Sequence, residues 1–207
     1  KGSLRKAKLH GTVTTTTTNL ERGVADADLV VVCTPVEDIV ERVCQVANSC
    51  PATALITDVG STKARIAKEL ERRIRGRASF VGSHPLAGSE RAGPENARAD
   101  LFRDRLVVIT PTGKSDEENV ERVEQFWRSL GARTLTMPAS AHDRAVSMTS
   151  HATHVIASAL AATTSDRELP LTASGWLDTT RIAAGDPELW RQILMENREQ
   201  VLKSLER

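Results

Sequence analysis

Short apolar runs recur along the first two thirds of the chain and alternate with longer segments of mixed polarity. The runs at residues 29–33, 54–57, 79–82 and 106–109 are rich in apolar residues, a pattern typical of strands that are covered on both faces. Residues 133–137 mix polar and apolar side chains and predict an edge strand. We therefore expect a sheet whose central strands are buried.

The segments between these runs have helical spacing. Residues 37–47, 63–74 and 116–130 place their apolar side chains on one helical face. Ser115 and Glu118 predict a capping box at the start of the last of these helices. Strand–helix alternation of this kind indicates an α/β fold, a mostly parallel sheet with helices on both faces.

The pattern changes after residue 138. Residues 139–207 show helical spacing only, so we predict an α/β domain at residues 1–138 followed by an all-α domain. Ser140 and Asp143 predict a capping box that opens a long helix. Asp186, which precedes a proline, predicts the start of another.

Composition excludes several classes of function. The 28 basic and 27 acidic side chains give a net charge of +1, which favours neither nucleic acid nor a membrane surface as a partner. Aromatic residues make up 3% and tyrosine is absent, so base-stacking platforms are not expected.

The cysteines and the uncharged run indicate the cellular setting. Cys33, Cys44 and Cys50 form neither an even set nor a Cys-x-x-Cys pair, which favours the reducing cytoplasm. Residues 145–164 carry no charge, but their two histidines and seven serines or threonines indicate a helix buried in protein rather than a membrane span.

Three polar segments carry the candidate chemistry: residues 58–63 (DVGSTK), 83–90 (SHPLAGSE) and 178–190 (DTTRIAAGDPELW). The first two, and the loop at residues 34–36, follow predicted strands. Ligands of open α/β sheets bind beyond the carboxyl ends of the strands, so we expect these loops to converge on one site.

His84 is the candidate general base. It precedes a proline at a strand end, where a histidine is often structural, but its flanking serines and Glu90 favour an acid–base role. Ser61 follows a glycine and opens a helix, either as its N-cap or as a hydroxyl near His84. Lys63 either binds phosphate or is a solvated helix residue.

Arg181 lies between stretches of small residues, where a long cation needs an anionic partner. That partner is either Asp178 or Asp186 within the chain, or the carboxylate of a substrate, which a guanidinium binds in a bidentate manner.

A polar stripe follows the uncharged helix and consists of Ser147, Ser150, His151, His154 and Ser158. It is either a hydrogen-bonded seam between helices or the wall of a pocket. A zinc pair is a third and weaker alternative, because no third ligand is evident and the spacing differs from the i, i+4 zinc helix. We expect no metal site.

These segments resemble those of the prephenate/arogenate dehydrogenase family of tyrosine biosynthesis, from about Ala27 to Gln200. Ser150-His-Ala-Thr-His154 is similar to the family's Ser-His-Leu-Pro-His stretch, with Ala-Thr in place of Leu-Pro. The resemblance implies a Rossmann-like domain followed by a helical substrate and dimerisation domain, and hence a homodimer. It implies oxidative decarboxylation of prephenate or arogenate with NAD or NADP.

The resemblance also implies individual roles. His84 would deprotonate the ring hydroxyl of the substrate, and Ser61 would contact that hydroxyl and orient His84. Substrate-binding roles are implied for Arg181, His154, Ser150, Glu90 and Asp178. Cofactor-binding roles are implied for Thr34, Pro35, Val36, Asp58 and Gly60.

One departure from the family concerns the cofactor. The family begins with a Gly-x-Gly-x-x-Gly strand–turn–helix that holds the pyrophosphate, and this sequence has none. We therefore expect the first β-α-β unit to precede Lys1, and further helices to follow the last residue.

Two alternatives remain open. One is a non-catalytic relic or regulatory module that binds a dicarboxylate. The other is a dehydrogenase of the β-hydroxyacid type, which would carry a lysine on the first long helix of its second domain. Residues 140–164 contain no lysine, which argues against it.

Overall fold

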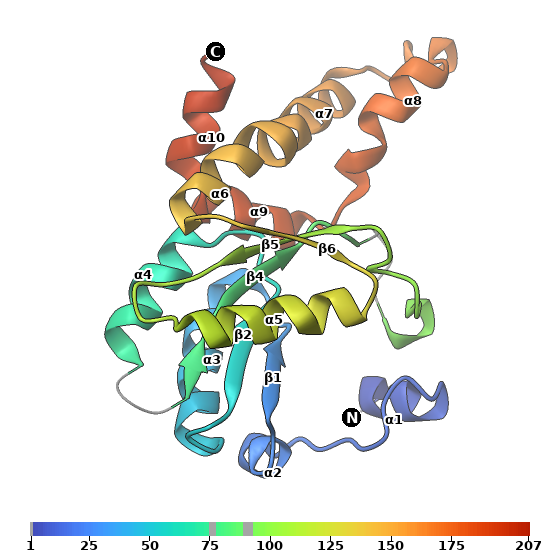
Figure 1. The fold of residues 1–207 in the computed structure, drawn as a ribbon. Helices are drawn as coiled ribbons and strands as arrows, with labels where there is room; N and C mark the ends of the chain where they lie inside the picture. The colour runs from blue at the N-terminus through green and yellow to red at the C-terminus, as the bar shows by residue number, and fades with distance from the viewer. Residues whose placement is uncertain (1, 75–77, 89–92) are drawn as a thin grey trace. The chain divides into compact units, whose positions relative to one another are not determined.

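The computed structural model describes residues 2–74, 78–88 and 93–207 (Figure 1). The chain folds into two compact units, Lys1–His142 and Asp143–Arg207. The first unit contains all the strands of the described residues, and the second is helical.

The first three strands of the first unit are parallel. They are β1 (Leu29–Val32), β2 (Leu55–Asp58) and β3 (Ser79–Phe80), in the order β1-β2-β3. After β3 the chain continues through Val81, whose N–H donates to the Ile56 carbonyl at 3.0 Å. The predicted buried strands at residues 29–33, 54–57 and 79–82 are therefore present, within one or two residues at their ends.

A second set of strands consists of β4 (Gly82–Pro85), β5 (Leu106–Thr110) and β6 (Arg133–Thr136). β5 and β6 are parallel, whereas β4 and β5 are antiparallel. A parallel return needs a long crossover, usually a helix. Between β4 and β5 the described residues contain only the 3₁₀ turn η2 (Pro94–Asn96), and the chain returns in the opposite direction.

Amphipathic helices connect the parallel strands (Figure 1). They are α3 (Ile39–Ser49), preceded by the 3₁₀ turn η1 (Val36–Asp38), then α4 (Ala64–Arg73) and α5 (Glu117–Ser129). Before β1 lie two helices that the apolar pattern did not predict, α1 (Gly2–Leu9) and α2 (Leu20–Val24).

The predicted capping role of Ser115 is wrong. Helix α5 begins one residue later than that role requires, with Asp116 at the N-cap. The Ser115 hydroxyl instead accepts from the Thr112 N–H at 2.9 Å and donates to the Phe80 carbonyl at 3.0 Å. The Ser115 hydroxyl therefore bonds a backbone carbonyl on β3 and does not cap the first turn of α5.

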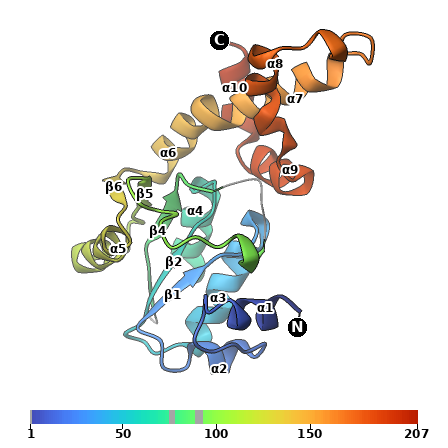
Figure 2. The same ribbon diagram turned by 90° about the vertical axis from the view of Figure 1, so that its right-hand side faces the viewer.

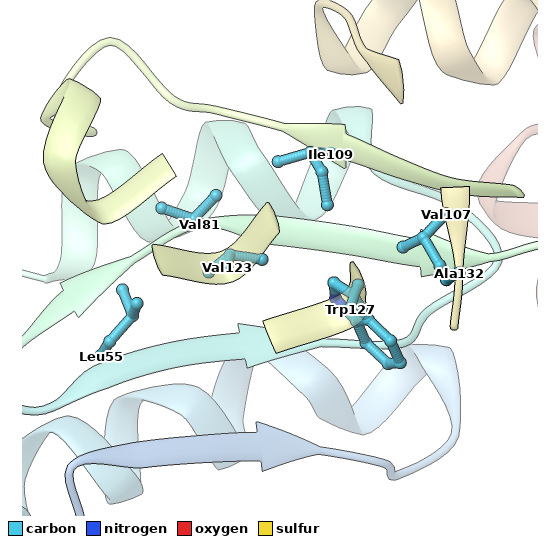
Figure 3. Close-up of a cluster of buried hydrophobic side chains, with 7 residues drawn as sticks. All are labelled: Leu55, Val81, Val107, Ile109, Val123, Trp127 and Ala132. Atoms are coloured by element: carbon cyan, nitrogen blue, oxygen red, sulfur yellow. The ribbon is translucent and has the colours of Figure 1, made fainter. Parts of the chain in front are cut away.

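The core of the first unit lies between α5 and strands of both three-stranded sheets (Figure 3). Its buried members are Leu55, Val81, Val107, Ile109, Val123, Trp127 and Ala132. Trp127 of α5 is 1% exposed and contacts the rings of Phe102 and Phe126 edge-on. This packing holds α5 against the strands that carry the candidate base.

The second unit is drawn from a second viewpoint in Figure 2. Helix α6 (Ala139–Val146) runs into it and continues as a π-helical turn, η3 (Ser147–His151), and then as α7 (Ala152–Thr163). The predicted long helix is thus present but interrupted. No helix of the described residues is long and apolar enough to span a bilayer.

Shorter helices complete the second unit. They are η4 (Leu169–Leu171), α8 (Ser174–Thr180), η5 (Arg181–Ala184), α9 (Pro187–Glu196) and α10 (Arg198–Leu205). The predicted N-cap at Asp186 is confirmed, since its side chain accepts from the Leu189 N–H at 2.8 Å.

Candidate functional site

The loops that follow β1 and β2 lie side by side. Val32, the last residue of β1, is in register with Asp58, the last residue of β2. Beyond this pair, the Val59 N–H donates to the Val32 carbonyl at 3.2 Å. The loop at residues 34–36 and the loop at residues 58–63 therefore leave the same edge of the sheet, as expected.

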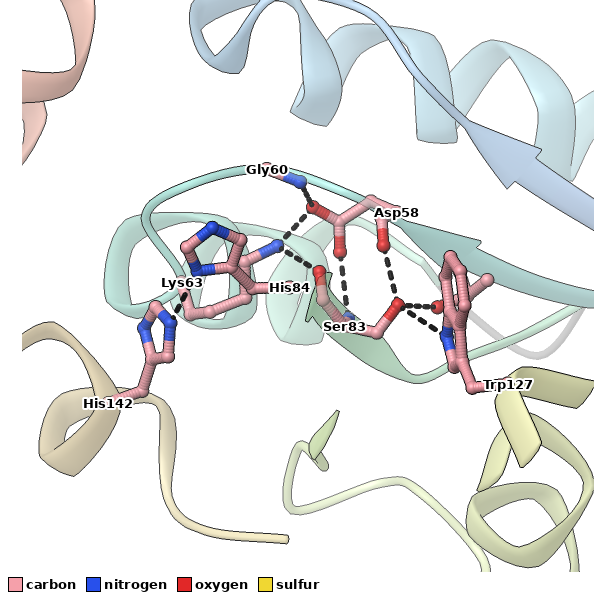
Figure 4. Close-up of polar contacts among 8 residues, drawn as sticks. Asp58, Gly60, Lys63, Ser83, His84, Trp127 and His142 are labelled. Atoms are coloured by element: carbon pink, nitrogen blue, oxygen red, sulfur yellow. Dashed lines mark hydrogen bonds and ion pairs between the residues drawn. The ribbon is translucent and has the colours of Figure 1, made fainter. Parts of the chain in front are cut away.

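A buried ion pair joins the second of these loops to β4 (Figure 4). Lys63 donates to the carboxylate of Asp58, and their side chains are 1% and 0% exposed. Asp58 also accepts from the Ser83 N–H at 3.2 Å, while Lys63 donates to the Ser83 carbonyl at 2.9 Å. The interpretation of Lys63 as a solvated helix residue is therefore wrong, because its side chain is buried and paired with Asp58.

Ser83 is held through its side chain as well. Its hydroxyl lies 2.6 Å from the Asp58 carbonyl and 2.9 Å from the Thr57 hydroxyl, and it accepts from the Trp127 indole N–H at 3.0 Å (Figure 4). All of these groups are buried. The residue immediately before His84 is therefore fixed by partners from β2, α5 and the start of α4.

His84 itself pairs with a second histidine. Its Nδ1 lies 2.8 Å from Nε2 of His142 on α6, and the two rings meet edge to face at 75° (Figure 4). His142 is 1% exposed, whereas His84 is partly exposed. Sequence reasoning placed His142 only inside a capping box. No local signal marks it, because the pair spans 58 residues.

Ser61 does not cap α4, because the N-cap position of that helix belongs to Lys63. Ser61 is half-buried in the loop whose Asp58 and Lys63 bond to the backbone of Ser83, the residue before His84. The next residue, Thr62, is 1% exposed and its hydroxyl has no hydrogen-bond partner among the described residues.

The candidate cofactor-binding residues differ in how deeply they are buried. The Thr34 hydroxyl is buried and has no hydrogen-bond partner among the described residues. Gly60 is tightly enclosed, since a Cβ there would lie 2.6 Å from Ile39 Cδ1 and 2.9 Å from Asp58 Oδ2. Pro35 is exposed and Val36 is buried.

In the second unit, His154 stacks on Trp190 with the ring centroids 3.6 Å apart and the planes 8° from parallel. His151 meets the same indole edge-on at 6.3 Å. Gly185 leaves room for the Trp190 indole, since a Cβ at residue 185 would lie 2.4 Å from Trp190 Nε1. The indole is therefore enclosed by α7 and the turn before α9.

Burial lowers the pKa of the His154 imidazole below its usual value, and a hydrogen bond with the Ile182 backbone opposes this only in part. Its Nδ1 is buried and has no partner among the described residues. Neutral imidazole at physiological pH and an uncommitted ring nitrogen suit a hydrogen bond to a ligand.

Arg181 begins η5, directly before Ile182, and its side chain is exposed. Within the described residues it forms no ion pair with Asp178 or Asp186. Asp178 is exposed on α8, and Asp186 caps α9. The internal salt bridge that sequence reasoning left open is therefore absent from the described part of the chain.

Part of the polar stripe forms hydrogen bonds between helices. Ser147 bonds Ser204 of α10 at 2.8 Å, and His151 bonds Asn197 at 3.1 Å, which is the helix–helix seam left open as one alternative. Ser150 is half-buried in the π turn. Glu90, the remaining candidate, lies outside the described residues.

Two family models match the chain. Residues 1–136 match the nucleotide-binding domain of prephenate dehydrogenase, and residues 138–207 match its dimerization domain. Together they cover almost the whole sequence.

Two individual proteins of related function are also similar to this chain in sequence. The chain is 35% identical over 187 residues to a prephenate dehydrogenase of Bacillus subtilis, covering 87% of this chain and 50% of that protein. It is 33% identical over 197 residues to a cyclohexadienyl dehydrogenase of Zymomonas mobilis, covering 92% and 67%. The chain thus spans about half to two thirds of the length of these relatives.

A solved structure is also similar along the chain. It is a prephenate dehydrogenase of Aquifex aeolicus in complex with hydroxyphenyl propionate and NAD+, with a TM-score of 0.89 and 32% identity, covering 99% of this chain and 73% of that one. The anchored histidine at the sheet edge, the helical second unit and these matches together place the chain in the prephenate dehydrogenase family.

Proposed function

We propose that the protein containing this chain oxidatively decarboxylates a cyclohexadienol, prephenate or arogenate, with NAD or NADP as the hydride acceptor. The observation that carries the proposal is the position of His84. Its imidazole on β4 contacts His142, and the residue before it is bonded to the loop that contains Ser61. The two units of the chain also match the two domains of the family.

The chain's own part in the reaction is proton removal and alignment. His84 would take the proton of the ring hydroxyl as a hydride leaves the ring and the ring carboxylate departs as carbon dioxide. Ser61 would hold the same hydroxyl. Because the ring becomes aromatic, the carbon–carbon cleavage is strongly favoured, and the protein mainly has to orient the substrate and accept the proton.

The loops at the sheet edge fit a nicotinamide cofactor. The buried Thr34 hydroxyl needs a partner, and Gly60 lets its loop lie close to α3. Thr34, Pro35, Val36 and Gly60 would line the nicotinamide end, and Asp58 would hold the loop that carries Gly60. When bound, the cofactor supplies the acceptor for the hydride.

Residues of the second unit fit the carboxylates of the substrate. Arg181 presents an exposed guanidinium, which is suited to bidentate binding of a carboxylate. His154 is held neutral by burial and offers a ring nitrogen. Ser150, Asp178 and Glu90 are the further substrate-binding residues of the proposal.

We also infer a homodimer joined through the helical unit. The match to a dimerization domain supports it. So does the apolar surface of α7 and α10, where Ile156, Leu160, Leu202 and Leu205 are 38–57% exposed. Apolar side chains grouped on adjacent helices favour a protein partner.

A cytoplasmic location is part of the proposal. Cys33, Cys44 and Cys50 are all free thiols in the structure, which suits a reducing compartment.

The test uses the full gene product that contains this chain and follows formation of reduced cofactor with prephenate or arogenate and NAD or NADP. His84→Asn should lower kcat by about 10²–10⁴-fold, the usual contribution of a general base. His10→Asn changes an exposed histidine and serves as the matched control. Full turnover by a folded His84→Asn protein, or no turnover by the wild type with any pair, would refute the proposal.

A further inference from the structure

The histidine pair constrains the protonation of His84. Its Nδ1 and the Nε2 of His142 are 2.8 Å apart, a hydrogen-bonding distance. Between two neutral imidazoles such a bond needs one N–H and one lone pair. If His142 donated, His84 would carry its remaining proton on Nε2 and would have no lone pair to offer a substrate. If His84 donates, its Nε2 is the basic atom.

The pair is also held in place on both sides. His142 is 1% exposed on α6, and the residue before His84 is fixed by the buried Asp58–Lys63 pair. The two ring planes meet edge to face at 75°, with their centroids 5.0 Å apart. Both partners of this contact are therefore positioned by buried groups of the first unit.

We propose that His142 is a positioning residue for the base. Its Nε2 accepts the Nδ1–H of His84 and holds that ring in the tautomer whose Nε2 takes the substrate proton. When the proton arrives, the His84 imidazolium still donates from Nδ1, and this bond strengthens because its donor is now charged. The inference rests on the proposed function, in which His84 is the base.

Two variants of the full gene product separate this role from simple packing. His142→Phe keeps an aromatic ring but removes the acceptor, so kcat should fall by about 10- to 100-fold, as for loss of a hydrogen bond to a group that becomes charged. KM for the cyclohexadienol should change little. His142→Gln places an amide oxygen near the position of Nε2 and should recover most of kcat. Equal kcat in the wild type and a folded His142→Phe protein would overturn the proposal.

A direct measurement covers the case in which His142→Phe does not fold. NMR of the wild type with ¹⁵N-labelled histidine reports the tautomer of His84. A proton on Nδ1 supports the proposal, and a proton on Nε2 overturns it. The two roles are tested separately. A fully active His84→Asn protein refutes the catalytic role of His84, whereas loss of activity in His84→Asn with no effect in His142→Phe refutes only the role of His142.

Discussion

At the residue scale, the side chain with the most unexpected position is Lys63. Its ammonium group lies inside the protein, paired with Asp58 and bonded to the Ser83 carbonyl. Two buried charges are costly to desolvate, and the pair is stable only because further hydrogen bonds satisfy it. Here those bonds go to the backbone on both sides of Ser83, so the ion pair ties the β2–α4 loop to β4.

Asp58→Asn should therefore lower the free energy of unfolding by about 3–5 kcal/mol, because the variant leaves a buried ammonium without its anion. Urea denaturation measures this change in the free energy of unfolding. Adding Lys63→Met to this variant should restore part of the loss. Glu199→Gln, which breaks the exposed pair with Lys203, is the matched control and should have little effect. An Asp58→Asn protein as stable as the wild type would contradict the role of the pair.

The lowered pKa of His154 predicts how the free energy of unfolding depends on pH. Burial lowers its pKa in the folded protein, so the unfolded chain binds the proton more readily. The free energy of unfolding should be highest above the unfolded pKa of about 6.5 and should decrease as the pH falls through that value toward the lower folded pKa.

Denaturation curves at several pH values, compared with those of His154→Gln, test this expectation. The variant should lose part of the pH dependence, whereas His10→Gln, which changes an exposed histidine, should retain it. The same slope in His154→Gln and the wild type would rule out the burial effect.

At the element scale, the π turn η3 interrupts a helix that local spacing predicts as continuous. Ser147 of this turn bonds both the Arg144 carbonyl and Ser204 of α10, and His151 at its end bonds Asn197. Side-chain partners on the facing helix thus coincide with the changed helical register. π turns of this kind are often found at functional sites, and here the turn contains Ser150 and precedes His154.

The loop between β2 and α4 depends on a glycine at its centre. In Gly60→Ala the new methyl group would lie 2.6 Å from Ile39 Cδ1 and 2.9 Å from Asp58 Oδ2. We expect a loss of about 1–3 kcal/mol in the free energy of unfolding from overpacking. Gly175→Ala, where a Cβ meets nothing within 4 Å, is the control and should not destabilise the protein. Thermal or urea unfolding of both variants decides the point.

At the scale of the whole molecule, the two units contribute different chemistry to the proposed reaction. The sheet unit carries His84, the proposed base, and the loops proposed to bind the cofactor, whereas the helical unit carries Arg181 and His154, which are proposed to bind the substrate. The helical unit also exposes the apolar side chains expected to bind a second copy.

Charges introduced on that apolar surface test the dimer. Ile156→Glu with Leu160→Glu, both on α7, should shift the full gene product from dimer to monomer in sedimentation experiments, because the introduced carboxylates would be buried without partners. Leu9→Glu alters an exposed leucine of α1 and should leave the association unchanged. A dimer that survives both α7 substitutions would place the interface elsewhere.

The order of strands and helices could be read from the chain because it follows local periodicity. The runs at residues 106–109 and 133–137 became β5 and β6 with their ends shifted by at most one residue, and the Asp186 cap formed as predicted. Each of these depends on neighbours within one turn or one strand. The prediction that Ser115 caps α5 was wrong, because its hydroxyl donates to a backbone carbonyl on β3.

By itself, the sequence determined the alternation of elements, the edge of the sheet where the loops meet, and His84 as the candidate base. Only the tertiary structure decided that Lys63 is buried, that β4 runs antiparallel to β5, and that His142 is the partner of His84. The reason is physical: these features depend on contacts between segments about 20 to 60 residues apart, and periodicity along the chain carries information only about near neighbours.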